Sequence, residues 1–312
     1  MRGRSIVVAA WFGFLGLWPQ PVDAAFSSNE TGTSGAQFLS LGLDARALGM
    51  GEAMTAVPNG PDSLYWNPAA LASLPNRQIS LSHTQLFSDF YFDSLSYGQP
   101  VASLQGTLAA NFSLLNQTGI TAVTNTGQRL PGTFSPYSSS LSLGYARQMG
   151  PWQAGAALKG IKEQLYDATA YAAAIDGGVI YSWDKRRNLG FAFRNWGTKE
   201  RFVNQSFPLP FEFDLGASYG WSDVLFAADL SFPYYGATNA KFGFEYRAAM
   251  SGNSAYALRA GYKTLPAYDL NVLSGITIGG GFELNRFSFD FGFEPMGGLG
   301  QVYRFSLGYR WQ

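Results

Sequence analysis

Apolar and polar side chains alternate along most of the chain after residue 76. The clearest run is Phe287–Glu294, in which four Phe residues share one face, opposite Ser, Asp, Gly and Glu. The stretches Phe211–Trp221 and Val302–Trp311 repeat this pattern with Phe, Leu, Tyr and Trp. Because successive side chains of a strand point to opposite faces, this period of two predicts β-strands with one apolar and one polar face.

Two architectures alternate in this way, a soluble sandwich with its apolar face inward and a membrane barrel with its apolar face outward. Strand length separates them. Strands of soluble proteins average about 5–6 residues, whereas the alternating runs here extend to about ten, which at about 3.3 Å per residue and a tilt of about 45° rise about 23 Å. That rise matches the apolar band of an outer-membrane barrel, about 25 Å tall. The pattern therefore predicts an all-β, antiparallel transmembrane barrel.

About fourteen strands are expected, an even number, as in bacterial barrels. Short and long connections mostly take turns between them, as expected when both termini lie in the periplasm. The first pair is the exception, because its outer loop would be very short and Asp93 falls among apolar positions. The expected strands are Arg77–Leu86, Phe90–Tyr97, Leu104–Leu114, Tyr137–Arg147, Trp152–Lys162, Tyr171–Trp183, Leu189–Trp196, Phe211–Trp221, Val224–Phe232, Lys241–Arg247, Tyr256–Lys263, Ile276–Leu284, Phe287–Glu294 and Val302–Trp311.

Composition narrows the function classes. The chain of 312 residues has 21 basic and 21 acidic residues, one His and no Cys, and only 13% of its residues are charged. A balanced charge argues against a nucleic-acid partner. The absence of Cys excludes disulfides, thiolate metal sites and a lipid-anchored Cys. With a single His, a transition-metal site is not expected either, and no cofactor is predicted.

The first 24 residues are typical of a secretory signal peptide. Arg2 and Arg4 precede the apolar run Ile6–Trp18, and Val22-Asp23-Ala24 provides a small-x-small cleavage site. An anchor helix is the alternative, but 13 apolar residues are fewer than the roughly 20 needed to span a bilayer. We therefore expect three parts: a signal peptide over 1–24, an N-terminal segment over 25–75 and the barrel over 76–312.

An enzyme is not predicted. Gly216–Gly220 spells the G-x-S-x-G nucleophile elbow, which needs a sharp strand-to-helix turn and a His base. Here the motif falls within an alternating strand, and His83 is the only His of the chain. Chance composition in a Gly/Ser-rich strand explains the match.

Residues 26–74 differ from the barrel region, with short helix-like patches and turn signals. They include Ala45-Arg46-Ala47-Leu48-Gly49-Met50-Gly51 and Tyr65-Trp66-Asn67-Pro68-Ala69. These two stretches resemble the N-terminal signature of the PorV/PorQ group of outer-membrane proteins, relatives of the FadL fatty-acid transporters. The resemblance covers about fifty residues, and Asn-Pro-Ala is shared with FadL itself.

The resemblance implies that this segment is a plug, or hatch, inside a fourteen-stranded barrel. A barrel of that size leaves a lumen that must be filled. Arg46 is then expected to pair with an inward acid such as Asp214, Asp290 or Glu294, the alternative being that it caps a short helix in solvent. The expected plug or ligand-binding residues are Phe38, Leu41, Arg46, Met50, Trp66, Asn67 and Pro68.

Charges on the polar faces of the strands are expected to line the lumen. They suit ion pairs that lock a plug better than an apolar tunnel, so any apolar ligand pocket would have to come from the plug itself. We favour ordinary packing as the role of the apolar plug residues, because packing is the commoner use of apolar clusters. The expected lumen charges are Asp214, Glu283, Asp290, Glu294, Arg304 and Arg310.

Three functions follow as alternatives. The first, which we favour, is the binding or passage of hydrophobic small molecules across a bacterial outer membrane, as likeness to FadL implies. The second, implied by PorV, is a type IX secretion component that binds cargo and hands it to a surface attachment complex. The third is a structural or narrow-pore barrel.

The expected location is the outer membrane of a Gram-negative bacterium, reached by export. The expected partners are outer-membrane lipid, a hydrophobic ligand or secretion-system proteins, and the barrel assembly machinery. The terminal strand resembles the signal which that machinery recognises, although Gln312 stands where the last residue is usually aromatic.

Overall fold

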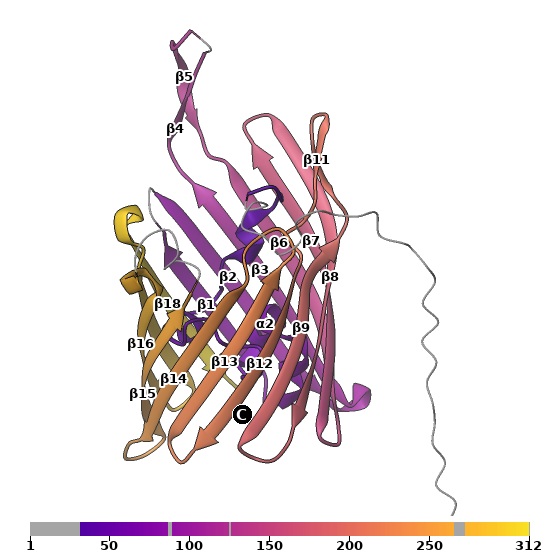
Figure 1. The fold of residues 1–312 in the computed structure, drawn as a ribbon, viewed down its shortest axis with the longest axis vertical. Helices are drawn as coiled ribbons and strands as arrows, with labels where there is room; N and C mark the ends of the chain where they lie inside the picture. The colour runs from indigo at the N-terminus through magenta and orange to yellow at the C-terminus, as the bar shows by residue number, and fades with distance from the viewer. Residues whose placement is uncertain (1–31, 87–88, 125, 265–271, 312) are drawn as a thin grey trace, which may run out of the picture.

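The computed structural model describes residues 32–86, 89–124, 126–264 and 272–311. Fourteen antiparallel strands close into a barrel in the order β1-β18-β17-β16-β15-β14-β13-β12-β9-β8-β7-β6-β3-β2 (Figure 1). The predicted fold class is confirmed. The predicted signal peptide lies outside the described residues.

The barrel strands coincide with the predicted ones to within a few residues at each end. Their bounds are β1 Gln78–Gln85, β2 Phe90–Val101, β3 Gly106–Gln117, β6 Tyr137–Met149, β7 Trp152–Leu165, β8 Ala168–Ser182, β9 Arg187–Gly197, β12 Glu212–Trp221, β13 Val224–Pro233, β14 Asn239–Ala249, β15 Ser254–Lys263, β16 Ile276–Leu284, β17 Phe287–Pro295 and β18 Gln301–Arg310.

The apolar face of each strand points outward. Phe287, Phe289 and Phe291 are exposed on β17, and Leu215, Tyr219 and Trp221 are exposed on β12. The polar faces point into the lumen, where Asp214 and Glu294 are buried. Within the described residues, every barrel strand pairs with its neighbour in antiparallel register, so the wall has no free edge.

Asp93, the residue that breaks the alternation of the second strand, has a partner on the outer face. It lies opposite His83 of β1, and the two side chains are joined by a 2.6 Å contact between Nδ1 and Oδ1. Tyr91 stacks on the His83 ring, with 5.9 Å between the ring centroids. The polar pair therefore belongs to the first hairpin, and the predicted strand β2 is correct despite its irregular pattern.

Short turns join the strands at one end of the barrel, which we call the turn end, and longer connections join them at the other, the loop end (Figure 1). Two of the longer connections contain hairpins that alternation did not predict. They are β4 (Ile120–Val123) with β5 (Arg129–Phe134), and β10 (Glu200–Phe202) with β11 (Gln205–Phe207). The β4–β5 hairpin projects well beyond the barrel rim (Figure 1).

Residues 32–75 lie inside the barrel, and we call this segment the plug. It forms short elements, namely η2 (Gln37–Ser40), α1 (Ala45–Gly49), η3 (Gly60–Asp62), α2 (Ser63–Trp66) and η4 (Pro68–Ser73). Helix α1 contacts β15 to β18. On the opposite side of the lumen, η4 contacts β6, β7 and β8. In the described part of the chain, no helix is long and apolar enough to cross a bilayer.

Candidate functional site

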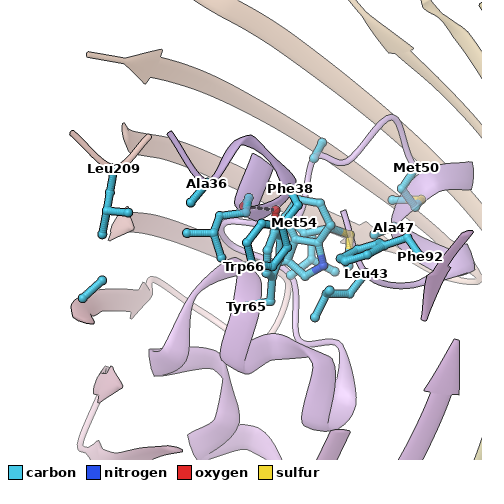
Figure 2. Close-up of a cluster of buried hydrophobic side chains, with 14 of the residues drawn as sticks. Ala36, Phe38, Leu43, Ala47, Met50, Met54, Tyr65, Trp66, Phe92 and Leu209 are labelled. Atoms are coloured by element: carbon cyan, nitrogen blue, oxygen red, sulfur yellow. Dashed lines mark hydrogen bonds between the residues drawn. The ribbon is translucent and has the colours of Figure 1, made fainter. Parts of the chain in front are cut away.

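The plug carries a buried apolar cluster in the middle of the lumen (Figure 2). It draws mainly on the plug. Outside the plug its members are Phe92 of β2, Ile161 of β7, Ala174 of β8, Ala227 of β13 and Leu209 from the connection after β11. Leu41, Leu86 and Leu115 pack against it while remaining partly exposed. Its largest members are Phe38, Leu39, Leu43, Met50, Met54, Tyr65, Trp66, Phe92, Ile161 and Leu209.

Trp66 lies at the centre of this cluster and is held on several sides. Its Nε1 donates to Asp44 Oδ2 at 3.0 Å, while Asp44 Oδ1 accepts from the backbone N–H of Ala47 at 2.8 Å and so caps α1. The Tyr65 ring meets Trp66 edge to face at a centroid distance of 4.8 Å. The Arg194 guanidinium lies 5.5 Å from the Trp66 ring centroid. The indole is therefore fixed by one hydrogen bond and a cation from the wall.

Asn67 and Pro68 form the turn that joins α2 to η4. The Asn67 amide Nδ2 donates to the carbonyl of Thr55 at 2.7 Å, and its Oδ1 accepts from Ala69 N at 3.0 Å. The side chain is fully buried. Because a residue before Pro is excluded from helical geometry, Asn67 ends one helix and caps the next. The Asn-Pro-Ala motif thus has a structural role within the plug.

Arg46 ties the plug to the wall, but through a partner that the sequence did not predict. Its guanidinium pairs with Glu245 of β14, with Nε 2.8 Å from Oε2 and Nη2 2.9 Å from Oε1. The partner is an inward acid of the wall, as expected, but it is none of the three named examples, Asp214, Asp290 and Glu294. Asp290 belongs to the same network indirectly. Arg259 bridges the two acids, at 2.7 Å from Asp290 and 2.6 Å from Glu245. Arg46 also donates to the carbonyl of Pro58 at 2.7 Å.

Glu52 forms a second ionic anchor. It lies 3.4 Å from Lys263 of β15 and 3.7 Å from Arg304 of β18. Burial acts to raise the pKa of Glu52, but the positive charges of Lys263, Arg304 and Lys241 outweigh it and lower that pKa to about 2. Glu294 shares Lys263 at 2.7 Å, and the carboxylate of Glu52 is charged at neutral pH.

The other predicted lumen charges form ion pairs along the wall. Asp214 accepts from Arg194 at 3.2 Å, and Glu212 contacts the same guanidinium at 2.6 Å. Nearer the turn end, Glu283 pairs with Arg247 and Arg310, both at 2.6 Å. The predicted lumen charges therefore face inward and are paired. The ion pairs of Glu283 join barrel strands to one another and do not involve the plug.

The lumen has little free space around the cluster. A void of about 10 Å³ lies between Phe38, Leu39, Tyr65 and Phe92 on one side and the Ser- and Asn-bearing strands β3 and β6 on the other. A larger cavity of about 330 Å³ lies at the turn end, with Arg46, Asp62 and Arg310 among its lining residues. A void of the smaller size holds about one water molecule, so the apolar cluster admits no larger guest unless the plug moves.

The connection over residues 198–210 covers the plug at the loop end, and we call it the strap. Glu200 Oε1 accepts from the backbone N–H of Ala36 at 3.0 Å, and the Gly35 N–H donates to Pro208 O at 2.9 Å. Burial, and next the carboxylate of Glu163, raise the pKa of Glu200 to about 8. Glu200 was not predicted, because nothing in a loop sequence shows that the loop folds back over the plug.

Glycines on the inner face of the wall were missed as well. A Cβ on Gly261 of β15 would overlap the backbone of Gly51, and a Cβ on Gly178 of β8 would overlap the Asn67 amide. The signal was present as Gly at inward positions of the strands, which in a strand marks a close approach of another backbone. The wall is therefore shaped to the plug.

The described residues contain no group of three or more His, Asp or Glu side chains placed to hold a metal. Ser218, the central residue of the G-x-S-x-G match, lies within strand β12, and its hydroxyl donates to Ala56 O at 2.9 Å. It contacts the plug and does not lie on a strand-to-helix elbow.

No model of a known protein family matches the chain, and no curated protein does. Solved structures do match. The toluene transporter TodX of Pseudomonas putida has a TM-score of 0.61 and 11% identity, covering 87% of this chain and 99% of its own. The toluene transporter TbuX of Ralstonia pickettii has a TM-score of 0.59, 12% identity and the same coverages.

A FadL homologue of Pseudomonas aeruginosa also matches, with a TM-score of 0.55 and 10% identity over 86% of this chain and 98% of that one. At these identities the likeness shows a shared fold, that of FadL-like transporter barrels. The PorV/PorQ resemblance gains no support from these comparisons, and it rests on the two plug motifs alone.

Proposed function

We propose that this chain is an outer-membrane channel that binds small hydrophobic molecules at the loop end and passes them inward past the plug. One observation carries the proposal, namely that an apolar cluster reaches from the plug to partly exposed leucines on the wall of an otherwise polar lumen. An outward apolar face, ten-residue strands and the FadL-like fold support the outer-membrane location.

The partly exposed residues mark the entry side. Leu86 directly follows β1, and Leu115 lies in the last part of β3, so both are near the loop end. From there the cluster continues through Phe92 to Tyr65 and Trp66. A molecule such as toluene, the substrate named for two of the similar structures, would meet apolar contacts along this route.

Passage requires the plug to shift, because the void beside the cluster is too small for a guest. The plug also meets the wall at β2, where Pro61 Cβ would lie 3.3 Å from a Cβ on Gly98, and the one atom nearer to that Cβ is Cδ2 of the flexible Leu74 side chain. The chain contains no Cys, so cysteines introduced at these two positions have only each other as partners. A Cβ separation near 3.5–4.5 Å suits a disulfide.

The test is uptake of radiolabelled toluene by cells that express the Pro61→Cys/Gly98→Cys variant, before and after reduction. We expect uptake when the variant is reduced and a fall to the level of cells lacking the protein when it is oxidised. The matched control is Leu143→Cys/Leu158→Cys, whose positions lie opposite each other on β6 and β7. This disulfide links wall to wall, so oxidation should leave uptake unchanged.

Two results would contradict the proposal in different ways. Equal uptake in the locked and unlocked states would show that molecules pass without movement of the plug. If the wild-type protein supports no uptake of toluene or of a long-chain fatty acid, the channel function fails and a structural barrel is left. The secretion role stays a prediction from the plug motifs, and co-purification of cargo would be its own test.

A further inference from the structure

A long apolar groove crosses the outer surface of the barrel over β9, β12, β13, β14 and β15, the side that faces the viewer in Figure 1. Its volume is about 810 Å³. One end lies at Trp183 and Arg187, beside the turn that joins β8 to β9, and the other reaches Ala260 and Tyr262 of β15. Because neighbouring strands are about 4.8 Å apart, crossing five strands spans about 19 Å.

Small side chains form the floor of the groove, and aromatic side chains form its walls. Ala217 and Ala228 lie directly opposite each other on β12 and β13. Phe226 and Phe244, whose rings are 5.5 Å apart, rise beside them. This profile is suited to an extended hydrocarbon chain lying along the wall, since the alanines leave space and the rings bound it.

The end of the groove at the turn is basic. Within residues 184–187, the carboxylate of Asp184 accepts from the backbone N–H groups of Arg186 and Arg187 at 2.8 Å and pairs with the Arg187 side chain at 2.7 Å. The hydrogen bonds from Arg187 and Arg186 lower the pKa of Asp184, so this carboxylate is charged at neutral pH.

Asp184 neutralises the charge of Arg187 but not the charges of the other two cations of the turn. Lys185 and Arg186 are exposed, and in the described part of the chain neither has an ion pair. Asp223 lies between β12 and β13, in the next turn along the wall, and its single carboxylate does not balance both cations. The groove therefore ends at a rigid turn with two available positive charges.

We propose that the groove and this turn bind one anionic phospholipid from the leaflet that faces the turn end. An acyl chain lies over Ala217 and Ala228, and the phosphate meets Lys185 and Arg186. The inference rests on the membrane location in the proposed function but not on transport. A second copy of this chain is the less suitable occupant, because a two-fold axis along the membrane normal would bring two basic turns together at the same depth.

The test is native mass spectrometry of the full chain in detergent with two probes, phosphatidylglycerol and phosphatidylcholine carrying the same acyl chains. We expect at least one phosphatidylglycerol to stay bound at concentrations where phosphatidylcholine is lost, with the preference falling as ionic strength rises. In the variant Lys185→Gln/Arg186→Gln, phosphatidylglycerol should bind about thirty-fold more weakly, since each cation near a headgroup contributes about a factor of five.

A second pair of variants tests the groove itself. Ala228→Trp fills the floor and should weaken both lipids, whereas Ala156→Trp, an exposed alanine on β7 outside the groove, should change neither. Equal binding of the two lipids by the wild type, or no effect of Ala228→Trp, would overturn the proposal. A wild-type dimer that Ala228→Trp dissociates would assign the groove to a second copy instead.

The outcomes separate this inference from the transport proposal. Uptake that persists without any lipid preference contradicts the lipid site alone. A clear phosphatidylglycerol preference in a protein that supports no uptake contradicts transport alone.

Discussion

Gly261 carries no side chain at a point where the backbone of the plug touches the wall. The atoms closest to a Cβ built there belong to Gly51 and Met50, and they are backbone atoms that cannot rotate away. On the neighbouring strand, a Cβ on Gly280 would have its nearest neighbour 3.9 Å away. The space beside Gly261 is filled and the space beside Gly280 is open, so the two glycines make a matched pair for substitution.

We expect Gly261→Ala to destabilise the plugged barrel by about 1–3 kcal/mol, the usual cost of forcing extra atoms into a filled interior. Gly280→Ala should be tolerated within about 0.5 kcal/mol. The measurement is the temperature at which each purified variant unfolds in detergent. Equal unfolding temperatures for the two variants would mean that the plug does not press on β15.

Asp62 is a buried plug carboxylate that lacks a full set of partners. Its Oδ1 has no hydrogen-bond partner, and burial, followed by the negative charge of Asp44, raises the pKa of Asp62 to about 7. Since the folded pKa lies above the unfolded value, the stabilisation is complete below about pH 4 and is lost as the pH rises through about 7.

The wild type should therefore lose stability between pH 4 and pH 7, by up to about 1.4 kcal/mol per pH unit from this group. Asp62→Asn, which stays neutral, should flatten that part of the profile. Unfolding temperature against pH is the measurement, with both proteins in the same detergent. A profile of the variant that parallels the wild type would assign the pH dependence to another group.

At the scale of elements, the strap holds the first residues of the plug through Glu200. Burial and the carboxylate of Glu163 raise the pKa of Glu200 to about 8, so its carboxyl group is mostly protonated at pH 7. Ionisation favours an open strap in which Glu200 is solvated, and the stability of the closed strap therefore falls as the pH rises towards 8, although the Ala36 hydrogen bond itself favours the charged form. We expect hydrogen exchange of the Ala36 amide, which donates to Glu200, to be several-fold faster at pH 8.5 than at pH 6 after correction for intrinsic rates.

Glu200→Gln tests this origin, because a neutral amide still accepts a hydrogen bond from Ala36 but does not titrate. The pH-dependent change in protection should disappear in the variant. Protection of the Ala47 amide, which donates to Asp44 inside the plug, is an internal reference that the strap should not affect.

The barrel strands could be predicted from the sequence because each one meets two different environments. Phe287, Phe289 and Phe291 face outward while Asp290 faces the lumen. The alternation of apolar and polar residues in the sequence reflects these two environments. The two loop hairpins show no such alternation. The strands β4 and β5, for example, are short and are not part of the barrel wall.

The site was predicted as a set of residues but not as a set of contacts. Arg46 and Glu245 are 199 residues apart, and no local pattern fixes how a plug rotates inside its barrel. Asp214, Asp290 and Glu294 were equally reasonable partners from alternation alone, because all three face inward. Glycines on the inner face of the strands indicate where the plug comes close to the wall. Only the folded structure shows which plug residue lies against each of them.

For the whole molecule, the question is whether the apolar cluster or the ionic anchors keep the plug in place. The cluster packs within the plug and against side chains of β2, β7, β8 and β13, whereas Arg46 and Glu52 form ion pairs with β14, β15 and β18. Removing one partner of an isolated buried ion pair costs about 3–5 kcal/mol. Each anchor is expected to contribute less than that, because Glu245 keeps Arg259 and Lys263 keeps Glu294 as partners. The anchors are therefore expected to set the closed state.

The double variant Arg46→Met/Glu52→Gln should consequently open to ions in a planar bilayer, while the wild type stays closed. A loss of about 3 kcal/mol raises the open fraction roughly a hundred-fold, enough to appear as intermittent conductance steps through the charged lumen. Arg247→Met is the matched control, because Arg247 pairs with Glu283 from wall to wall. Conductance in the control alone, or silence in the double variant, would mean that packing of the plug against the inner glycines keeps the barrel closed without its ion pairs.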